Sequence, residues 1–234
     1  MTRGEMKLRA RSLILTNPPR PHPCLVTLAL LAFIWIVNYL AQKIGGQPIL
    51  IDLNAVQKLD YQNMIRIDFA NAELVPTAIL ILFQLVDIVL SYGYIAYQLR
   101  VVRGEASGFS NLLDGFAITG RAIALTLLID ALVMVASAAL LVPGLILSYA
   151  YAMASYLQVD HPDWSPVRCM RESRLMMRGH KWELFVLQLS FLGWQILATI
   201  PGVSIFVKPY VAFTETVFYE NLRAPAAPQP PQEF

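Results

Sequence analysis

Two long apolar stretches of this chain are each divided by a Pro-Gly pair. Pro143-Gly144 divides residues 139–159, and Pro201-Gly202 divides residues 197–219. In both stretches an apolar helix of membrane length runs into the pair, and a second, tyrosine-containing apolar helix follows. Proline and glycine interrupt helices, so the pattern predicts two helical hairpins of a polytopic membrane protein.

The composition agrees with residence in a membrane. The 234 residues are 56% hydrophobic and 15% charged, whereas a soluble domain is about 45–50% apolar and about 25% charged. The net charge of +2 gives no sign of nucleic-acid binding, and two cysteines are too few for a cysteine-rich metal site. We therefore expect no nucleic-acid partner, no metal and no other cofactor.

Six segments have the apolar character of membrane spans, each near the required length of about 20 residues. We therefore predict an all-α fold, a polytopic membrane helical bundle of about six transmembrane helices with short amphipathic helices at the interface. We read the first span, which starts at Cys24, as a retained helix and not as a cleaved signal peptide. The expected spans are residues 24–42, 76–99, 121–142, 144–159, 182–200 and 202–222.

Three further segments complete the predicted organisation. Residues 1–23 form a basic N-terminal segment in which residues 5–15 are expected to lie as a helix on the membrane surface. Residues 43–75 read as an external loop carrying a short amphipathic helix. The membrane domain covers residues 24–223, and the proline-rich tail 224–234 is expected to be disordered.

Two short helices are predicted outside the spans. In the loop 100–120, Phe109, Leu112, Leu113 and Phe116 recur at helical spacing, which predicts a short helix along the membrane interface.

The second is the helix 166–178, with Ser165 as its N-cap, Pro166 at its first position and Gly179 at its end. One face carries Cys169, Met170, Ser173, Met176 and Met177. The rest is mainly basic and continues to Lys181, which makes these side chains candidate contacts for anionic lipid: Arg168, Arg171, Arg174, Arg178 and Lys181. An amphipathic helix on the membrane surface and an ordinary surface helix packed on the protein fit this pattern equally well.

The distribution of lysine and arginine sets the expected orientation. Fourteen of the eighteen fall in the segments that share a side with the N-terminus. The positive-inside rule then places both termini and the helix 166–178 in the cytoplasm, and both Pro-Gly turns on the outer face.

Three carboxylates lie within the predicted spans and form a candidate intramembrane polar site: Asp87, Asp130 and Glu215. A charge in the middle of a bilayer costs at least about 2.5–3.5 kcal/mol, so these side chains should face the bundle interior, pair or stay protonated. They could line a path for a proton, an ion or a small solute. The alternative, which we favour for the aspartates, is hydrogen bonding between helices. We expect Lys208 to extend outward and not to pair with Glu215.

No reaction centre is evident. His22, His161 and His180 show no metal-ligand spacing, and the glycines form neither a phosphate loop nor a dinucleotide motif. We therefore expect no catalytic residues and no enzymatic activity.

Most of the chain resembles a family of uncharacterised bacterial integral membrane proteins, known as domain of unknown function 975. The resemblance is carried by Pro143-Gly144 with its tyrosine-containing helix, by Arg171-Glu172-Ser173, by the run Met176 to Gly179, and by Lys181-Trp182. The segments 104–116 and 6–17 also fit. More distantly, the chain is similar to the membrane domain fused to some glycerophosphodiester phosphodiesterases, a domain without catalytic residues. These resemblances imply a bacterial plasma-membrane protein and no established activity.

The expected function is therefore that of a non-enzymatic, multi-pass plasma-membrane protein. It would act as a partner subunit, in stress tolerance, or in contact with lipids, with anionic headgroups at its inner face. The alternative is a proton-coupled permease or channel for small solutes that uses Asp87 and Asp130. Its partners are the bilayer and either a second copy or another membrane protein.

Overall fold

The computed structural model describes residues 1–15, 18–19, 21–44, 49–51, 65–67, 74–198 and 202–223. Almost all of these residues are helical, which confirms the expected all-α class. The chain forms two compact units, residues 29–87 and residues 1–28 together with 88–234. The expected disordered tail lies outside the described residues.

The smaller unit contains most of α2 (Pro23–Ile44), the start of α4 (Leu74–Arg103) and two short strands. Strands β1 (Ile49–Ile51) and β2 (Ile65–Ile67) pair antiparallel, with Ile49 opposite Ile67. β-Branched isoleucines favour such pairing. The short helix expected within residues 43–75 falls on 53–64, which lie outside the described residues.

In the larger unit, α4 is followed by a 3₁₀ helix, η1 (Phe109–Ile118), where the sequence predicted a short helix. Leu112 is buried, whereas Phe109, Leu113 and Phe116 are exposed.

The first hairpin is formed by α5 (Thr119–Ala139) and α6 (Leu141–Tyr151), which pack closely on each other. The break falls at Leu140, which has extended backbone, and not at Pro143-Gly144 as the sequence predicted. Proline is tolerated in the first turn of a helix because that N–H has no partner there. Gly144 allows close approach of the two helices, since a Cβ at this position would lie 1.9 Å from Ser137 Oγ.

The expected fourth and fifth spans are each divided into two helices. Residues 144–159 form most of α6 and then α7 (Ala154–Asp160), while residues 182–200 contain α9 (Lys181–Leu189) and α10 (Leu192–Leu197). An 11-residue helix such as α6 is about 16 Å long, short of a hydrocarbon core of about 30 Å. Neither segment is one continuous membrane-length helix.

Between these pairs lies α8 (Pro166–Met176), which follows the predicted capping. The Ser165 hydroxyl accepts a hydrogen bond from the backbone N–H of Arg168, and Pro166 occupies the first turn. Gly179 has φ +84°, the left-handed conformation expected after a helix end.

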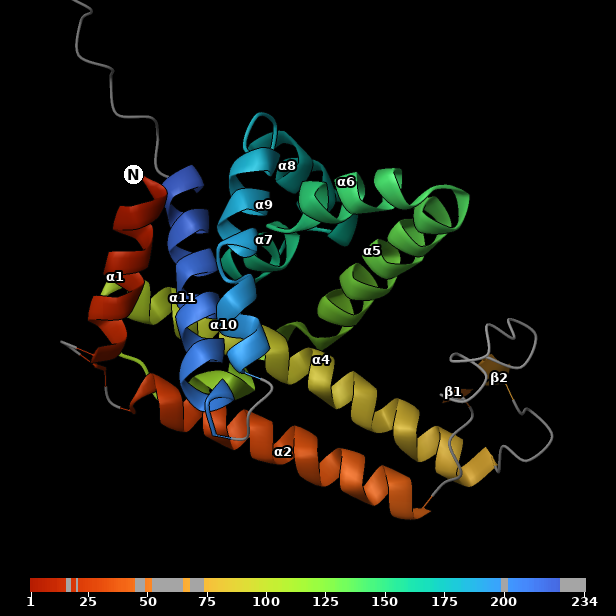
Figure 1. Ribbon diagram of the computed structural model, residues 1–234. Coiled ribbons are helices and arrows are strands. Elements are labelled where there is room, and N and C mark those ends of the chain that lie inside the picture. Colours follow the sequence, from red (N-terminus) through yellow and green to blue (C-terminus); the bar gives the residue numbers. More distant parts are fainter. Residues whose placement is uncertain are drawn as a thin grey trace, which may run out of the picture. The chain divides into compact units, whose positions relative to one another are not determined.

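The last helix, α11 (Ser204–Arg223), packs along α1 (Arg3–Leu15), as Figure 1 shows. The Met1 amino group donates to Asn221 Oδ1 (3.1 Å), so α1 starts at the C-terminal end of α11 and runs antiparallel to it. The surface helix expected at residues 5–15 is thus a packed helix, which buries Met6, Ala10 and Ile14.

The two hairpins are built differently. In the first, the helix after the turn is interrupted, whereas in the second the helix before the turn is interrupted and α11 is continuous. Gly202 has φ +91°, and Pro201 lies outside the described residues. This difference argues against a simple duplication of one hairpin.

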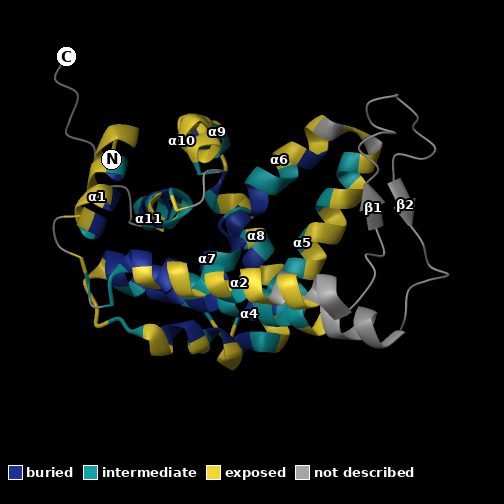
Figure 2. Ribbon diagram, turned by 60° about the horizontal axis from the view of Figure 1, so that its bottom comes forward, coloured by how far each residue is buried: buried dark blue, intermediate teal, exposed yellow. Residues whose placement is uncertain are grey.

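Within the described residues, two helical stretches are long and apolar enough to cross a membrane: Ile81–Arg103 and Phe109–Ala138. They differ in how far the protein covers them. Half of the most apolar part of Ile81–Arg103 is buried, against 17% of that of Phe109–Ala138. Figure 2 shows exposed residues along α5, and among them are Leu127, Met134 and Val135.

Candidate functional site

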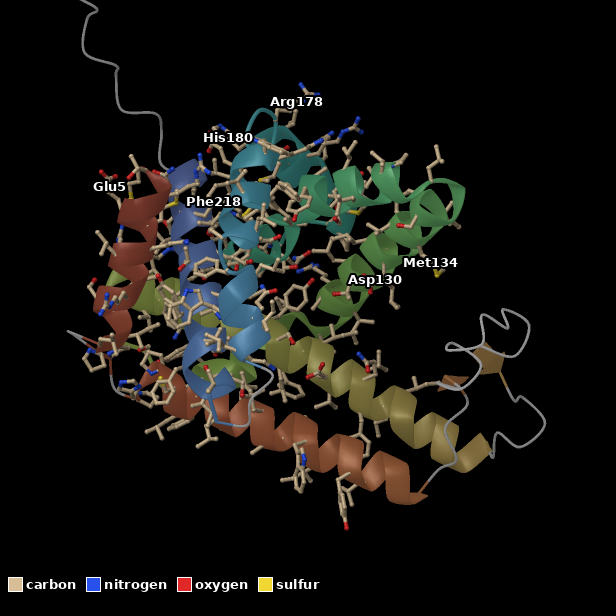
Figure 3. All side chains as sticks on the ribbon, viewed as in Figure 1. Glu5, Asp130, Met134, Arg178, His180 and Phe218 are labelled. Carbon is tan, nitrogen blue, oxygen red and sulfur yellow. The ribbon has the colours of Figure 1, made fainter. Side chains whose placement is uncertain are left out.

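The basic side chains predicted to contact lipid lie on and just after α8, and they point away from the protein. Arg168, Arg171, Arg174 and Arg178 are exposed, and Lys181 is half-buried. Figure 3 shows Arg178 at the surface. The Arg168 guanidinium lies 4.0 Å from the centre of the Trp164 ring, a cation–π contact.

The opposite side of α8 packs against α5, α6 and α7. Cys169, Ser173 and Met177 are fully buried there. Ser173 Oγ donates to the Ala150 carbonyl (3.0 Å), and Cys169 Sγ lies 3.5 Å from Gln158 Oε1. Burial raises the pKa of the Cys169 thiol to about 11. The two faces of this helix that the sequence predicted are therefore a packed face toward the protein and a face of arginines toward the outside.

The two mid-span aspartates lie in different units. Asp87 is half-buried and ends the 29–87 unit, whereas Asp130 is exposed on α5 in the larger unit (Figure 3). Neither carboxylate makes a hydrogen bond or an ion pair within the part of the chain that the structure describes. Asp130 therefore does not face the interior of this single chain, and the prediction that each aspartate faces the interior, pairs or stays protonated stays a prediction.

Glu215, the third predicted carboxylate, is paired. Gln188 Nε2 donates to Glu215 Oε1 (2.9 Å), and the Tyr149 hydroxyl donates to Gln188 Oε1 (2.8 Å). This chain joins α6, α9 and α11, which is the helix-to-helix hydrogen bonding that the sequence offered as a structural role. Lys208 is exposed, in line with its predicted outward direction.

An ionic cluster around one buried carboxylate, which sequence reasoning missed, joins the C-terminal ends of α4, α7 and α11. Asp160 is at its centre, with a side chain only 3% exposed. It pairs with Arg103 (2.8 Å) and Arg223 (3.2 Å), and it accepts a hydrogen bond from the Tyr219 hydroxyl (2.6 Å). Glu220 also pairs with Arg103 (2.6 Å). Asp160 is thus compensated on several sides, as a buried carboxylate requires.

A signal for this cluster was present in the sequence. The positive-inside count assigned Arg103 and Arg223 to one side of the membrane, and Asp160 follows an apolar helix at its predicted inner end. The partners are separated by 57 to 117 residues along the chain. Only the helix arrangement brings them together.

A polar cavity of about 530 Å³ borders the cluster. Its walls include three arginines, of which Arg100 pairs with Asp114 (3.0 Å) and Arg103 with Asp160. The third, Arg121, donates to the Pro162 carbonyl. Because acidic side chains line the same cavity, its charge is nearly balanced and it does not select an anion. Among the described residues, no three His, Cys, Asp or Glu side chains are grouped so as to hold a metal ion.

Comparison with known proteins decides the family. The model of the family "Protein of unknown function (DUF975)" matches residues 78–226. The chain belongs to the DUF975 family. No curated protein and no solved structure matches it significantly. The expected distant likeness to the membrane domain of glycerophosphodiester phosphodiesterases has no support in these comparisons.

Proposed function

We propose that this DUF975 protein is a non-enzymatic integral membrane protein whose basic α8 face binds anionic lipid headgroups. The observation that carries the proposal is the combination of two surfaces on the larger unit. The long apolar helix α5 is mostly uncovered by protein, and α8 presents its arginines outward. Soluble monomers rarely expose contiguous apolar surface on this scale.

The orientation that we propose has both termini and α8 on the cytoplasmic side of a plasma membrane. Contacts among five residues that are all expected on that side support it. Met1 bonds to Asn221, and Arg103, Asp160 and Arg223 form one ionic cluster. On this proposal α4 and α5 cross the bilayer.

The finer proposal of six crossings, with a membrane domain at residues 24–223, depends on the four remaining segments. Of these, α2 would cross as one helix and α11 would cross with α1 against one side. The other two, α6–α7 and α9–α10, would enter as interrupted helices. Such segments are tolerated at membrane depth only where protein protects them. Contacts of α6 and α7 with α5, of α6 with α9 and of α10 with α11 supply part of this protection.

Lipid selectivity tests the proposed role of α8. The test variant changes Arg168, Arg171, Arg174, Arg178 and Lys181 to Gln, and the matched control changes the four arginines to Lys. Protein purified in detergent is mixed with equal amounts of phosphatidylglycerol and phosphatidylcholine, and native mass spectrometry counts the retained lipids. Each basic residue near an anionic surface contributes about 1 kcal/mol. We expect the Gln variant to lose at least tenfold in preference for phosphatidylglycerol, while the Lys control keeps it.

An unchanged lipid preference in a folded Gln variant would refute the proposed role of α8. The broader roles compatible with such a surface are those of a subunit for another membrane protein and of a factor in membrane stress tolerance. Both would show as loss of a phenotype or of a co-purified partner in the same variant, with the Lys control intact.

A second candidate is a proton-coupled permease or channel. What favours it is that Asp87 and Asp130 have no hydrogen-bonding or ion-pair partner within the described residues, so no contact there fixes their charge. Reconstituted protein would then support pH-dependent solute flux that is lost in Asp87→Asn or Asp130→Asn. Equal flux in the doubly substituted protein would exclude this function.

A further inference from the structure

A second cavity, distinct from the α8 face and from the ionic cluster, lies between α1, α10 and α11. Its volume is about 310 Å³, at the small end of the range of ligand pockets, about 300–1,000 Å³. The walls are apolar over most of their area. They are formed chiefly by Ile14, Trp194, Phe206 and Val207.

Two polar side chains interrupt these apolar walls. Arg11 comes from α1 and Tyr210 from α11, and both line the cavity. The antiparallel packing of α1 on α11 is what brings a guanidinium to this apolar surface. The neighbouring arginine on the same helix, Arg9, is used differently, because it donates to the Val102 carbonyl (3.2 Å).

Arg11 has no carboxylate partner and no hydrogen bond within the part of the chain that is described. An exposed arginine beside an apolar cavity leaves a positive charge without a counter-charge at one end of a hydrophobic surface. Guanidinium groups bind carboxylates and phosphates through paired, charge-assisted hydrogen bonds. The complementary ligand has an anionic head and an apolar tail.

We propose that this cavity binds an anionic amphiphile, with its head on Arg11 and one acyl chain against Trp194, Phe206 and Val207. The Tyr210 hydroxyl provides a second hydrogen-bond donor for the head. A free fatty acid and an anionic phospholipid share this chemistry, and both are included in the test. The site uses no residue of α8.

The side chain of Trp194 provides the probe. A variant with Trp35, Trp164 and Trp182 changed to Phe keeps Trp194 as the only tryptophan of the chain. The full chain in detergent micelles is titrated with 9,10-dibromostearate, whose bromines quench nearby tryptophan fluorescence. A phosphatidylglycerol that carries the same brominated chain is titrated in parallel, and the ligand that quenches at lower concentration identifies the source.

We expect saturable quenching in the parent protein and a Kd at least tenfold weaker in Arg11→Gln, with Arg11→Lys in between. Arg3→Gln, which changes an exposed arginine at the other end of α1, leaves the Kd unchanged. The methyl ester of dibromostearate, which lacks the negative charge, binds the parent protein at least tenfold more weakly. Equal affinity of the acid and its ester would overturn the proposal without relying on any variant, and so would a Kd within twofold of the parent in a folded Arg11→Gln protein.

Discussion

Arginines gather in two regions of the larger unit, and the two groups are used differently. Arg103 and Arg223 are bound into a network with Tyr219 and Glu220 around the buried carboxylate of Asp160. On α8, Arg174 and Arg178 point outward and make no ion pair within the described residues. The sequence does not distinguish the two groups, because the positive-inside count places both on the cytoplasmic side.

The comparison separates arginines that hold the fold from arginines that are free to bind a ligand. A paired arginine beside a buried carboxylate is costly to remove, because its partner is left charged and uncompensated. An exposed arginine contributes little to stability, so the fold does not require an arginine at that position. Substitutions around Asp160 should therefore lower the stability, whereas substitutions of the outward arginines should lower lipid binding and leave the stability nearly unchanged.

The largest expected effect comes from Asp160→Asn. The change removes the negative charge that Arg103, Arg223 and Tyr219 all contact. Breaking a fully buried pair costs about 3–5 kcal/mol, and the partial exposure of both arginines makes the expected loss smaller than that. We expect a marked drop in the thermal unfolding midpoint in detergent micelles. Asp163→Asn, an exposed neighbour without an ion pair within the described residues, serves as the control and should melt like the parent. Equal midpoints for the two variants would contradict a structural role for the cluster.

A smaller effect is expected for Tyr219→Phe. This change deletes only the hydroxyl that donates to Asp160 Oδ2, and hydrogen bonds to charged groups contribute about 1.5–3 kcal/mol. The midpoint should fall by less than in Asp160→Asn. Adding Tyr219→Phe to Asp160→Asn should cost less than it does alone, because the two residues share one interaction. Full additivity in this double-mutant cycle would show that the hydroxyl does not act through Asp160.

The outward arginines should behave in the opposite way. Changing Arg171, Arg174 and Arg178 to Gln should shift the free energy of unfolding by less than about 0.5 kcal/mol for each residue, as for exposed charges generally. The same protein should show reduced retention of phosphatidylglycerol. Thermal melting and native mass spectrometry on one preparation test both statements. A large loss of stability would mean that the α8 arginines belong with the structural group.

The smallest effect concerns the buried side of α8. Burial raises the pKa of Cys169 from an ordinary 9.0 to about 11, so the folded protein holds very little thiolate at pH 8. In a Cys24→Ser background, maleimide labelling should be slow at pH 8 and should accelerate as the pH approaches 11. A raised pKa also means that the neutral thiol stabilises the fold below about pH 9, and that this contribution declines between about pH 9 and 11.

A cysteine on the opposite side of the same helix supplies the control for this reactivity. Arg174→Cys, in a protein with both native cysteines changed to Ser, should label rapidly at pH 8 whether or not the chain is folded. Labelling of Cys169 at the same rate as this exposed cysteine would show that α8 does not pack as described.

Local signals in the sequence predicted α8 well because its ends are determined locally. The Ser165 cap, Pro166 and Gly179 fix the helix bounds, and the alternation of buried and basic residues fixes its faces. The extents of α2, α4, α5 and α11 followed from their apolar length. Each of these features depends on neighbours within a few turns of the chain.

The breaks within α6–α7 and α9–α10 were not predictable in this way, since neither contains proline or glycine at the interruption. The second break contains Phe191, which is fully buried and lies beneath Lys7 of α1, with Tyr210 packed edge-to-face against its ring. Contacts with helices that are distant in the sequence, and not the helix propensity of the neighbouring residues, determine where this break falls. The Asp160 cluster was missed for the same reason, because its pairing is a property of the helix arrangement.

Membrane residence with α8 on the cytoplasmic side is the central claim, and cysteine accessibility tests it most directly. Single cysteines are introduced by Val142→Cys, just after α5, and by Arg178→Cys, after α8, in a chain with Cys24 and Cys169 changed to Ser. Intact cells are treated with a membrane-impermeant maleimide before and after permeabilisation. The account predicts labelling at position 142 in intact cells and at position 178 only after permeabilisation. Labelling of both positions from the same side would contradict it.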